Sequence, residues 1–170
     1  MIDNGKIGMT RPEIDAYLRT DGRFAAVASL RHDGAPFVIP MGYYYDGASL
    51  YFSTTRTMGL AKRLRRDPRV TVAVFDHDPI HGYVLVNGNA VEVDDPDNVL
   101  SLRMHHRYPK PTVTDQAEHD RIWLSVERVV FRLSTDSAFG MDQRKASDDL
   151  QSLAMPDRTA QREPQSELGA

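Results

Sequence analysis

The sequence contains no cysteine among its 170 residues. This absence excludes disulfide bonds, thiolate metal sites and cysteine nucleophiles. The chain also has no apolar run that approaches the roughly 20 residues needed to span a bilayer. Its amino-terminal segment, MIDNGKIGMTRPE, lacks the apolar core of a signal peptide. We therefore expect a cytoplasmic protein with no membrane partner.

Charge of one sign is not in large excess either, because 21 basic and 24 acidic side chains leave a formal net charge of -3 at pH 7. A chain with this balance does not bind nucleic acid through its overall charge. The dinucleotide fingerprint, the P-loop and the nucleophile elbow are all missing. The histidines have no convergent set of carboxylates beside them, so we expect no metal site.

What the sequence does contain is typical of one mostly-β domain. Short apolar or alternating segments are separated by turn signals such as Asp33-Gly34 and Asp46-Gly47. We expect strands over residues 24–31, 35–45, 48–53, 69–75, 83–93 and 126–134, and helices that begin at residues 10, 58, 95 and 115. Short strands with frequent turns predict a closed antiparallel β-barrel with short helices inserted.

The barrel domain is expected to cover residues 1–140. Beyond residue 140 the chain is polar, contains few large apolar side chains and ends in QREPQSELGA. A segment of this composition cannot bury enough apolar surface to offset the entropy of ordering it. We therefore expect residues 141–170 to form a flexible polar tail.

Two local patterns make specific structural predictions. Thr10 and Glu13 have the spacing of a capping box, which predicts a helix start at Thr10. Pro36 and Pro40 predict that their strand lies at a sheet edge or contains a bulge. Alternation gives the strand before it one face made of Phe24, Ala26, Ala28 and Leu30.

The most informative segment runs from residue 51 to residue 76, YFSTTRTMGLAKRLRRDPRVTVAVFD. A strand ends there in a loop of three hydroxyl side chains and Arg56, and a short basic helix follows. Hydroxyls, an arginine and a helix start commonly hold a phosphate or another anion together. The alternative is that the basic side chains form an ordinary solvated helix face. For Arg56, the position beside three hydroxyls favours the anion site.

The ordered segments FAAVASLRHDGAPFVIPMGYYYDGASLYFSTT, AKRLRRDPRVTVAVFD, GYVLVNGNAVEV and VVFRLSTDSAFG resemble the pyridoxamine 5'-phosphate oxidase-like, FMN-binding split β-barrel superfamily. Within it, the chain is most similar to the flavin- and deazaflavin-dependent oxidoreductases common in actinobacteria. The resemblance covers residues 10–140. It implies a homodimer with the cofactor site at its interface, and a small-molecule substrate.

The resemblance also implies a set of cofactor-binding residues. On the phosphate side these are Ser53, Thr54, Thr55, Arg56, Lys62 and Arg63. On the ring side they are Pro40, Met41, Gly42 and Tyr43. In one departure, the phosphate-binding lysine that is usual before the helix leucine is replaced here by the segment Met58-Gly59-Leu60. Arg56 or Lys62 is then the candidate to compensate.

These observations favour a flavin- or deazaflavin-dependent oxidoreductase that transfers hydride between its cofactor, FMN or the deazaflavin coenzyme F420, and a small organic substrate. No catalytic side chain is identified. The alternative is a non-catalytic split barrel that binds flavin, haem or another ligand, which the departure at residues 58–60 favours. A true pyridoxamine phosphate oxidase fits less well, because the chain is short and lacks the S-R-K phosphate residues. Trp123 is expected either to anchor packing or to close a pocket.

Overall fold

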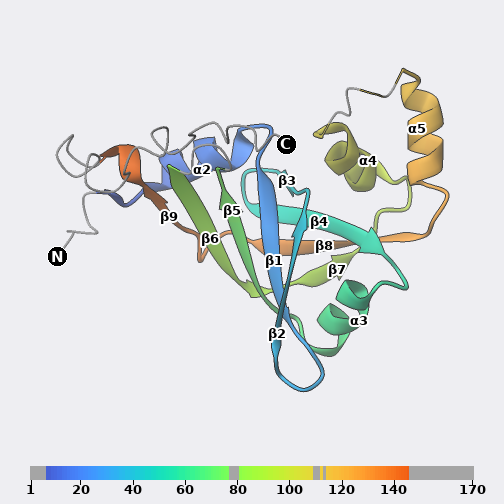
Figure 1. The fold of residues 1–170 in the computed structure, drawn as a ribbon, viewed down its shortest axis with the longest axis horizontal. Helices are drawn as coiled ribbons and strands as arrows, with labels where there is room; N and C mark the ends of the chain where they lie inside the picture. The colour runs from blue at the N-terminus through green and yellow to red at the C-terminus, as the bar shows by residue number, and fades with distance from the viewer. Residues whose placement is uncertain (1–6, 77–80, 109–111, 113, 146–170) are drawn as a thin grey trace, which may run out of the picture.

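The computed structural model of the chain describes residues 7–76, 81–108, 112 and 114–145. Within these residues the fold is mostly β, with nine strands in two antiparallel sheets and four short α-helices (Figure 1). The strands are β1 (Phe24–Leu30), β2 (Pro36–Met41), β3 (Tyr44–Tyr45), β4 (Ser49–Thr55), β5 (Arg69–Phe75), β6 (Gly82–Asn89), β7 (Val91–Val93), β8 (Arg128–Ser134) and β9 (Phe139–Asp142). The helices are α2 (Arg11–Arg19), α3 (Gly59–Arg66), α4 (Val99–His106), α5 (Gln116–Trp123) and the 3-10 helix η1 (Gln143–Lys145). The predicted fold class, a β-barrel with short helices, is confirmed.

The chain passes from one sheet to the other four times, and at two of these crossings a corner of one or two residues joins consecutive strands. The five-stranded sheet has the order β2-β1-β5-β6-β9, and the four-stranded sheet has the order β3-β4-β8-β7. The corners are at Gly42-Tyr43, after β2, and at Ala90, after β6. The strands of the two sheets cross at a large angle (Figure 1), which is the geometry of two sheets linked by strands that switch between them.

Each corner divides a segment that we counted as one strand, although Asn87-Gly88-Asn89 indicates a bulge or a barrel corner in the second segment. The expected total of about six strands is therefore wrong. Residues 35–45 form β2 and β3, and residues 83–93 form β6 and β7. Proline and glycine at these places weaken a continuous ladder, which allows the chain to leave one sheet for the other. The strand β9 was not predicted, because it is only four residues long and contains Gly140.

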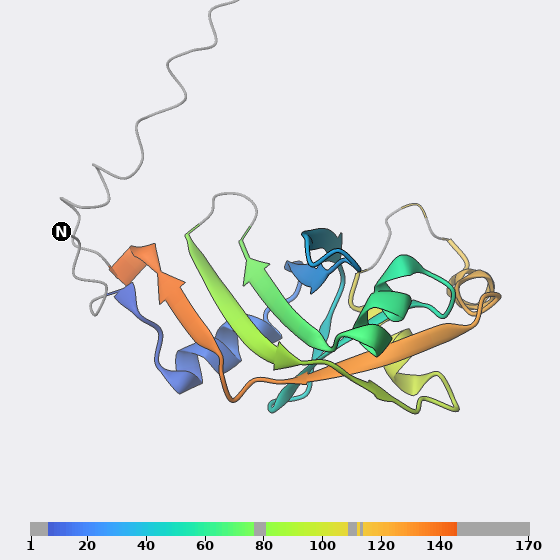
Figure 2. The same ribbon diagram turned by 90° about the horizontal axis from the view of Figure 1, so that it is seen from below.

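The ordered structure continues past residue 140, where we expected the polar tail to begin. β9 ends at Asp142 and η1 follows directly. Figure 2 shows β9 and η1 at one end of the molecule and α5 at the other. Residues 146–170, which make up most of the predicted tail, lie outside the described residues.

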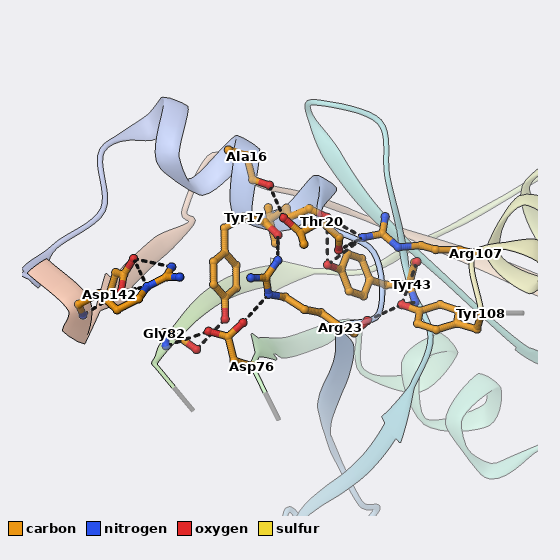
Figure 3. Close-up of polar contacts among 12 residues, drawn as sticks. Ala16, Tyr17, Thr20, Arg23, Tyr43, Asp76, Gly82, Arg107, Tyr108 and Asp142 are labelled. Atoms are coloured by element: carbon orange, nitrogen blue, oxygen red, sulfur yellow. Dashed lines mark hydrogen bonds and ion pairs between the residues drawn. The ribbon is translucent and has the colours of Figure 1, made fainter. Parts of the chain in front are cut away.

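The core lies between the two sheets, and α2 contributes its apolar side chains to it. Ile14, Tyr17 and Leu18 of α2 are buried, as their spacing in the sequence predicts. The hydroxyl of Tyr17 donates to the backbone oxygen of Gly82 at 2.6 Å, and the Arg23 guanidinium lies 3.8 Å from the centre of the tyrosine ring (Figure 3). Burial raises the pKa of Tyr17 to about 12.

The predicted capping box at the start of α2 is confirmed, and it also holds η1. Oε2 of Glu13 accepts from the backbone nitrogen of Thr10 at 2.6 Å and from its hydroxyl at 2.8 Å. The same oxygen accepts from Nζ of Lys145 at 2.8 Å. The Lys145 ammonium first, and then the Thr10 donors, hold the pKa of Glu13 at about 2, below its ordinary value of 4.5.

Because the pKa of Glu13 is lower in the folded state, its carboxylate stabilises the protein above pH 4.5. This contribution is lost as the pH falls from 4.5 towards 2. We expect Glu13→Gln to lower the melting temperature at pH 6, and the difference from the wild type to shrink steadily below pH 4. Thermal unfolding followed by circular dichroism measures this, and a difference that does not change with pH would contradict it.

The outer face of the β1–β2 hairpin is apolar and exposed. β2 is an edge strand, as its prolines predict. Alternate side chains of β1, such as Val27, point into the core, while the intervening ones point outwards. Phe24 is 48% exposed and Val38 is 56% exposed. The outward residues of the two strands are Phe24, Ala26, Ala28, Leu30, Pro36, Val38 and Pro40.

Candidate functional site

A cavity of about 300 Å³ lies where the corner after β2 meets β4, β8 and the helices α4 and α5. Its lining residues are Phe24, Met41, Gly42, Ser53, Met104, His105, Tyr108, Trp123 and Arg128. They come from both sheets and from segments far apart in the sequence. The volume is at the lower end of the roughly 300–1,000 Å³ that small-molecule sites occupy.

Gly42 allows the backbone to pass directly against the ring of Tyr108. A Cβ atom at Gly42 would lie 2.6 Å from Cε2 of Tyr108. The ring is held in place, because its hydroxyl donates to the backbone oxygen of Arg23 at 2.7 Å and accepts from the backbone nitrogen of Tyr43 at 3.1 Å. One wall of the cavity is therefore a flat ring against bare backbone.

Replacing Gly42 with alanine is expected to lower the free energy of unfolding by about 1–3 kcal/mol, the usual cost of overpacking. The cause is the collision with the Tyr108 ring, and urea denaturation measures the effect. In a Tyr108→Leu background the same substitution should cost much less, because the ring is gone. An equal cost in both backgrounds would show that the strain arises elsewhere.

The three hydroxyls of the predicted phosphate loop point to two sides of a strand. The segment is the end of β4 rather than a loop. Thr54 is directed into the core and is 8% exposed, whereas Ser53 and Thr55 face the other side. Only Ser53 of these three lines the cavity. Alternation along a strand separates side chains that a loop could have brought together.

Arg128 brings a positive charge to the cavity. It lies opposite Thr55 in the pairing of β4 with β8. Its Nε donates to Oγ of Ser53 at 3.2 Å, and its guanidinium carbon lies 3.5 Å from the centre of the Trp123 ring. Among the described residues it has no carboxylate partner, and burial lowers the pKa of Arg128. Arg128 was not predicted from the sequence, because only the register of β8 against β4 brings it here.

Trp123 is packed between Arg128 and His105, so it both anchors packing and lines the cavity. The His105 ring stacks on the indole with 4.4 Å between ring centres. Nε2 of His105 in turn lies 2.9 Å from Nδ1 of His119. Nε1 of Trp123 is buried and has no hydrogen-bond partner in the described part of the chain. A buried indole N–H is a donor that a bound ligand can satisfy.

Arg56 and Lys62, the two candidates to replace the missing lysine, are not among the cavity residues. Nε of Arg56 lies 2.5 Å from a carboxylate oxygen of Glu127, so its charge is already paired. Lys62 is exposed on α3. Neither residue therefore lines the cavity with Met41, Gly42 and Ser53.

Arg63 lies at the contact between α3 and β1. Its Nε donates to Oγ of Ser29 at 2.9 Å, and its guanidinium carbon lies 4.2 Å from the centre of the Phe37 ring. Burial, followed by the neighbouring charges of Arg66 and Arg31, lowers the pKa of Arg63. In this chain Arg63 packs a helix against the first hairpin.

On the ring side of the predicted site, Tyr43 and Pro40 do not line the cavity. Tyr43 is fully buried, and its hydroxyl donates to the backbone oxygen of Leu18 at 2.9 Å (Figure 3). This burial raises the pKa of Tyr43. Pro40 is exposed on the outer face of the hairpin. Met41 and Gly42, which stand between them in the sequence, do line the cavity.

The residues that meet in the cavity fit a cofactor with a planar ring and an anionic group. A guanidinium without a carboxylate partner suits a phosphate or a carboxylate. Aromatic and apolar walls suit a ring system. The unpaired N–H of Trp123 provides one further donor. Ser53, Arg128 and Trp123 would therefore hold the polar part of such a group, and Met41 and Gly42 would contact its ring.

The part of the chain that the structure describes contains neither a candidate metal site nor a helix that could span a membrane. No group of three or more histidine and acidic side chains there is arranged to hold a metal ion. His106, for example, is paired with Asp120, with 2.9 Å between Nε2 and Oδ1. None of the described helices is long and apolar enough to cross a membrane.

Two crossed antiparallel sheets with a cavity at one corner define a split β-barrel protein. Residues 10–133 match the family described as pyridoxamine 5'-phosphate oxidase, and the chain belongs to this family. The resemblance that we inferred from the sequence is confirmed.

Several solved structures are similar to this chain. A conserved hypothetical protein from Mycobacterium tuberculosis superposes with a TM-score of 0.70 at 24% identity, over 92% of this chain and 94% of that one. An F420 reductase superposes with a TM-score of 0.58 at 25% identity, over 73% of this chain and 94% of that one. An FAD-binding protein from Mesorhizobium loti gives a TM-score of 0.55 at 24% identity, over 82% and 97% of the two chains.

Proposed function

We propose that this protein is a flavin- or deazaflavin-dependent oxidoreductase, which transfers hydride between bound FMN or F420 and a small organic substrate. The family supports this proposal, as do two similar structures, one an F420 reductase and the other an FAD-binding protein. The observation that carries it is the cavity. There Met41 and Gly42, from the ring side of the predicted site, lie beside Ser53, from the phosphate side, and Arg128.

In this proposal the cofactor supplies the hydride chemistry, and the chain positions it and excludes water. Arg128 and Ser53 bind the anionic part. Gly42 leaves room for a ring to approach the backbone, because it has no side chain. Tyr108 and Met104 provide apolar surface that keeps water from the reacting atoms.

We also propose that the protein is a homodimer in which the second copy completes the site. The apolar outer face of the β1–β2 hairpin is the surface that a second copy would bury. Phe24 belongs to this face and also lines the cavity, so the face and the cavity are continuous. A cavity of about 300 Å³ in one chain would be enlarged by residues from the other.

An absorption spectrum of the purified protein, followed by titration with FMN and with F420, tests the redox proposal. We expect one of the two to bind tightly, to bleach on reduction and to recover on reoxidation. Riboflavin serves as the control for ring binding without phosphate. Failure of both cofactors to bind would overturn the proposal.

A second candidate function, non-catalytic ligand binding, is favoured by the start of α3. Met58 stands in the segment where the phosphate lysine is usual, and it is 59% exposed. As the N-cap of α3 it makes no side-chain hydrogen bond to the helix. Under this alternative, the bound cofactor should be reduced and reoxidised no faster than the free cofactor. Stopped-flow absorption with and without the protein distinguishes the two functions.

A further inference from the structure

The guanidinium of Arg128 is oriented before any ligand arrives. Its Nε is occupied by Oγ of Ser53 at 3.2 Å, which fixes the direction of the guanidinium plane. Its two Nη groups have no partner among the described residues. Two parallel N–H donors on a planar fork match the two oxygens of a carboxylate or a phosphate.

A stack of three planar groups keeps this fork rigid. The guanidinium carbon lies 3.5 Å from the Trp123 ring centre, and His105 covers the indole with an interplanar angle of 22°. His105 is itself tied through Nε2 to Nδ1 of His119 at 2.9 Å. The side chain of His105 is only 5% exposed, so the stack is supported from within α4 and α5. A fork held in this way loses little entropy when it binds an anion.

The residues around the Arg128 guanidinium indicate the chemistry of the rest of the ligand. Phe24, Met41, Met104 and Tyr108 give the cavity walls that are mainly apolar or aromatic. Among the residues that line this cavity, Arg128 is the one lysine or arginine, and there is no aspartate or glutamate. A ligand that fits is therefore flat and largely apolar, with one anionic group at its end.

We propose that Arg128 is the oxyanion-binding residue of this cavity, and that the cavity takes a planar apolar ligand with a terminal carboxylate or phosphate. The inference rests on the same cavity as the proposed function, but it does not require redox turnover. The oxyanion has two sources, the phosphate of a flavin cofactor or the carboxylate of a substrate. The bidentate fork is common to both, and binding measurements distinguish them.

The test uses the fluorescence of Trp123, the only tryptophan in the chain, together with calorimetry. Benzoate is the carboxylate probe, and the pair FMN and riboflavin is the phosphate probe. Arg128→Lys keeps the charge but loses the fork. We expect it to lower the affinity for at least one of the two probes, benzoate or FMN, by about tenfold or more. Arg132→Lys is the matched control on the same face of β8, where Arg132 is exposed, and it should leave both affinities unchanged.

The pattern of losses identifies the source of the oxyanion. If Arg128→Lys abolishes the preference for FMN over riboflavin, the fork binds the cofactor phosphate. If that preference is unchanged while benzoate binding is lost, the fork binds a substrate carboxylate. Unchanged affinities for benzoate and FMN in Arg128→Lys would overturn the inference, as would a wild-type protein that binds neither probe.

A second variant covers the case in which Arg128→Lys does not fold. Ser53→Ala keeps the guanidinium but releases its Nε, so we expect a weakening of about three- to tenfold for the same probe. No weakening in this variant would overturn the inference. The redox proposal fails separately: benzoate binding that depends on Arg128, without binding of FMN or F420, would refute the oxidoreductase and leave the oxyanion site standing.

Discussion

Replacing Arg107 with methionine is expected to lower the free energy of unfolding by about 2–4 kcal/mol, because loss of this buried charged donor leaves several acceptors without partners. One terminal nitrogen, Nη2, donates to the backbone oxygens of Leu18 at 3.0 Å and Thr20 at 2.7 Å, and to the Tyr43 hydroxyl at 3.3 Å (Figure 3). The Arg107 side chain is only 8% exposed. It joins the end of α4 to the end of α2, so urea denaturation should register the loss directly.

Arg103→Met provides the matched control on the same helix. Arg103 donates through Nη1 to the hydroxyl of Tyr44 at 3.1 Å in an exposed contact. We expect a change of less than about 1 kcal/mol for this variant, as is usual for a surface contact. Equal losses for the two variants would mean that Arg107 stabilises the protein through helix composition and not through its contacts with α2.

Replacing Val38 with glutamate is expected to convert a dimer into a monomer. Val38 is 56% exposed in the single chain, so a glutamate there is solvated and should leave the fold intact. In the proposed dimer the same carboxylate would be buried without a partner, which costs several kcal/mol. Size-exclusion chromatography with light scattering measures the change. If the second copy completes the cavity, affinity for the cofactor should fall at least about tenfold in the same variant.

Val91→Glu is the control for this substitution. Val91 lies on β7, in the other sheet, and is 50% exposed. The two variants make the same valine-to-glutamate change at similarly exposed positions, but on different surfaces of the protein. We expect the Val91→Glu protein to remain a dimer with normal cofactor affinity. A wild-type protein that is monomeric at all concentrations would contradict the proposed dimer.

Local patterns were sufficient to predict most of the elements that surround the site. The capping box of Thr10 and Glu13 places the start of α2 by hydrogen bonds that span three residues. Alternating valines predict β5 over residues 69–75, and the prolines of β2 predict an edge strand. These features depend on chemistry within one turn or one strand, which the sequence carries in full.

The exact places where the long strands divide were beyond such patterns. Asn87-Gly88-Asn89 indicates a bulge or a barrel corner within residues 83–93, but β6 continues through these three residues and the chain changes sheets at Ala90. The backbone nitrogen of Ala90 donates to the oxygen of Pro68, 22 residues earlier, at 2.8 Å. The neighbouring strands of both sheets decide where a strand exchanges one partner for another. The segment itself does not encode these neighbours.

The sequence by itself determined the family, the mostly-β fold and the chemical types available for a site: hydroxyls, arginines and the segment Pro40-Met41-Gly42. Only the tertiary structure decided which of them meet. Arg128 and Ser53 are 75 residues apart and are brought together by the register of β8 against β4. Thr54 is directed into the core by strand alternation, and Arg56 is paired with Glu127. Register, alternation and charge pairing are properties of neighbouring strands, so the composition of a cavity follows from the folded arrangement and not from any one segment.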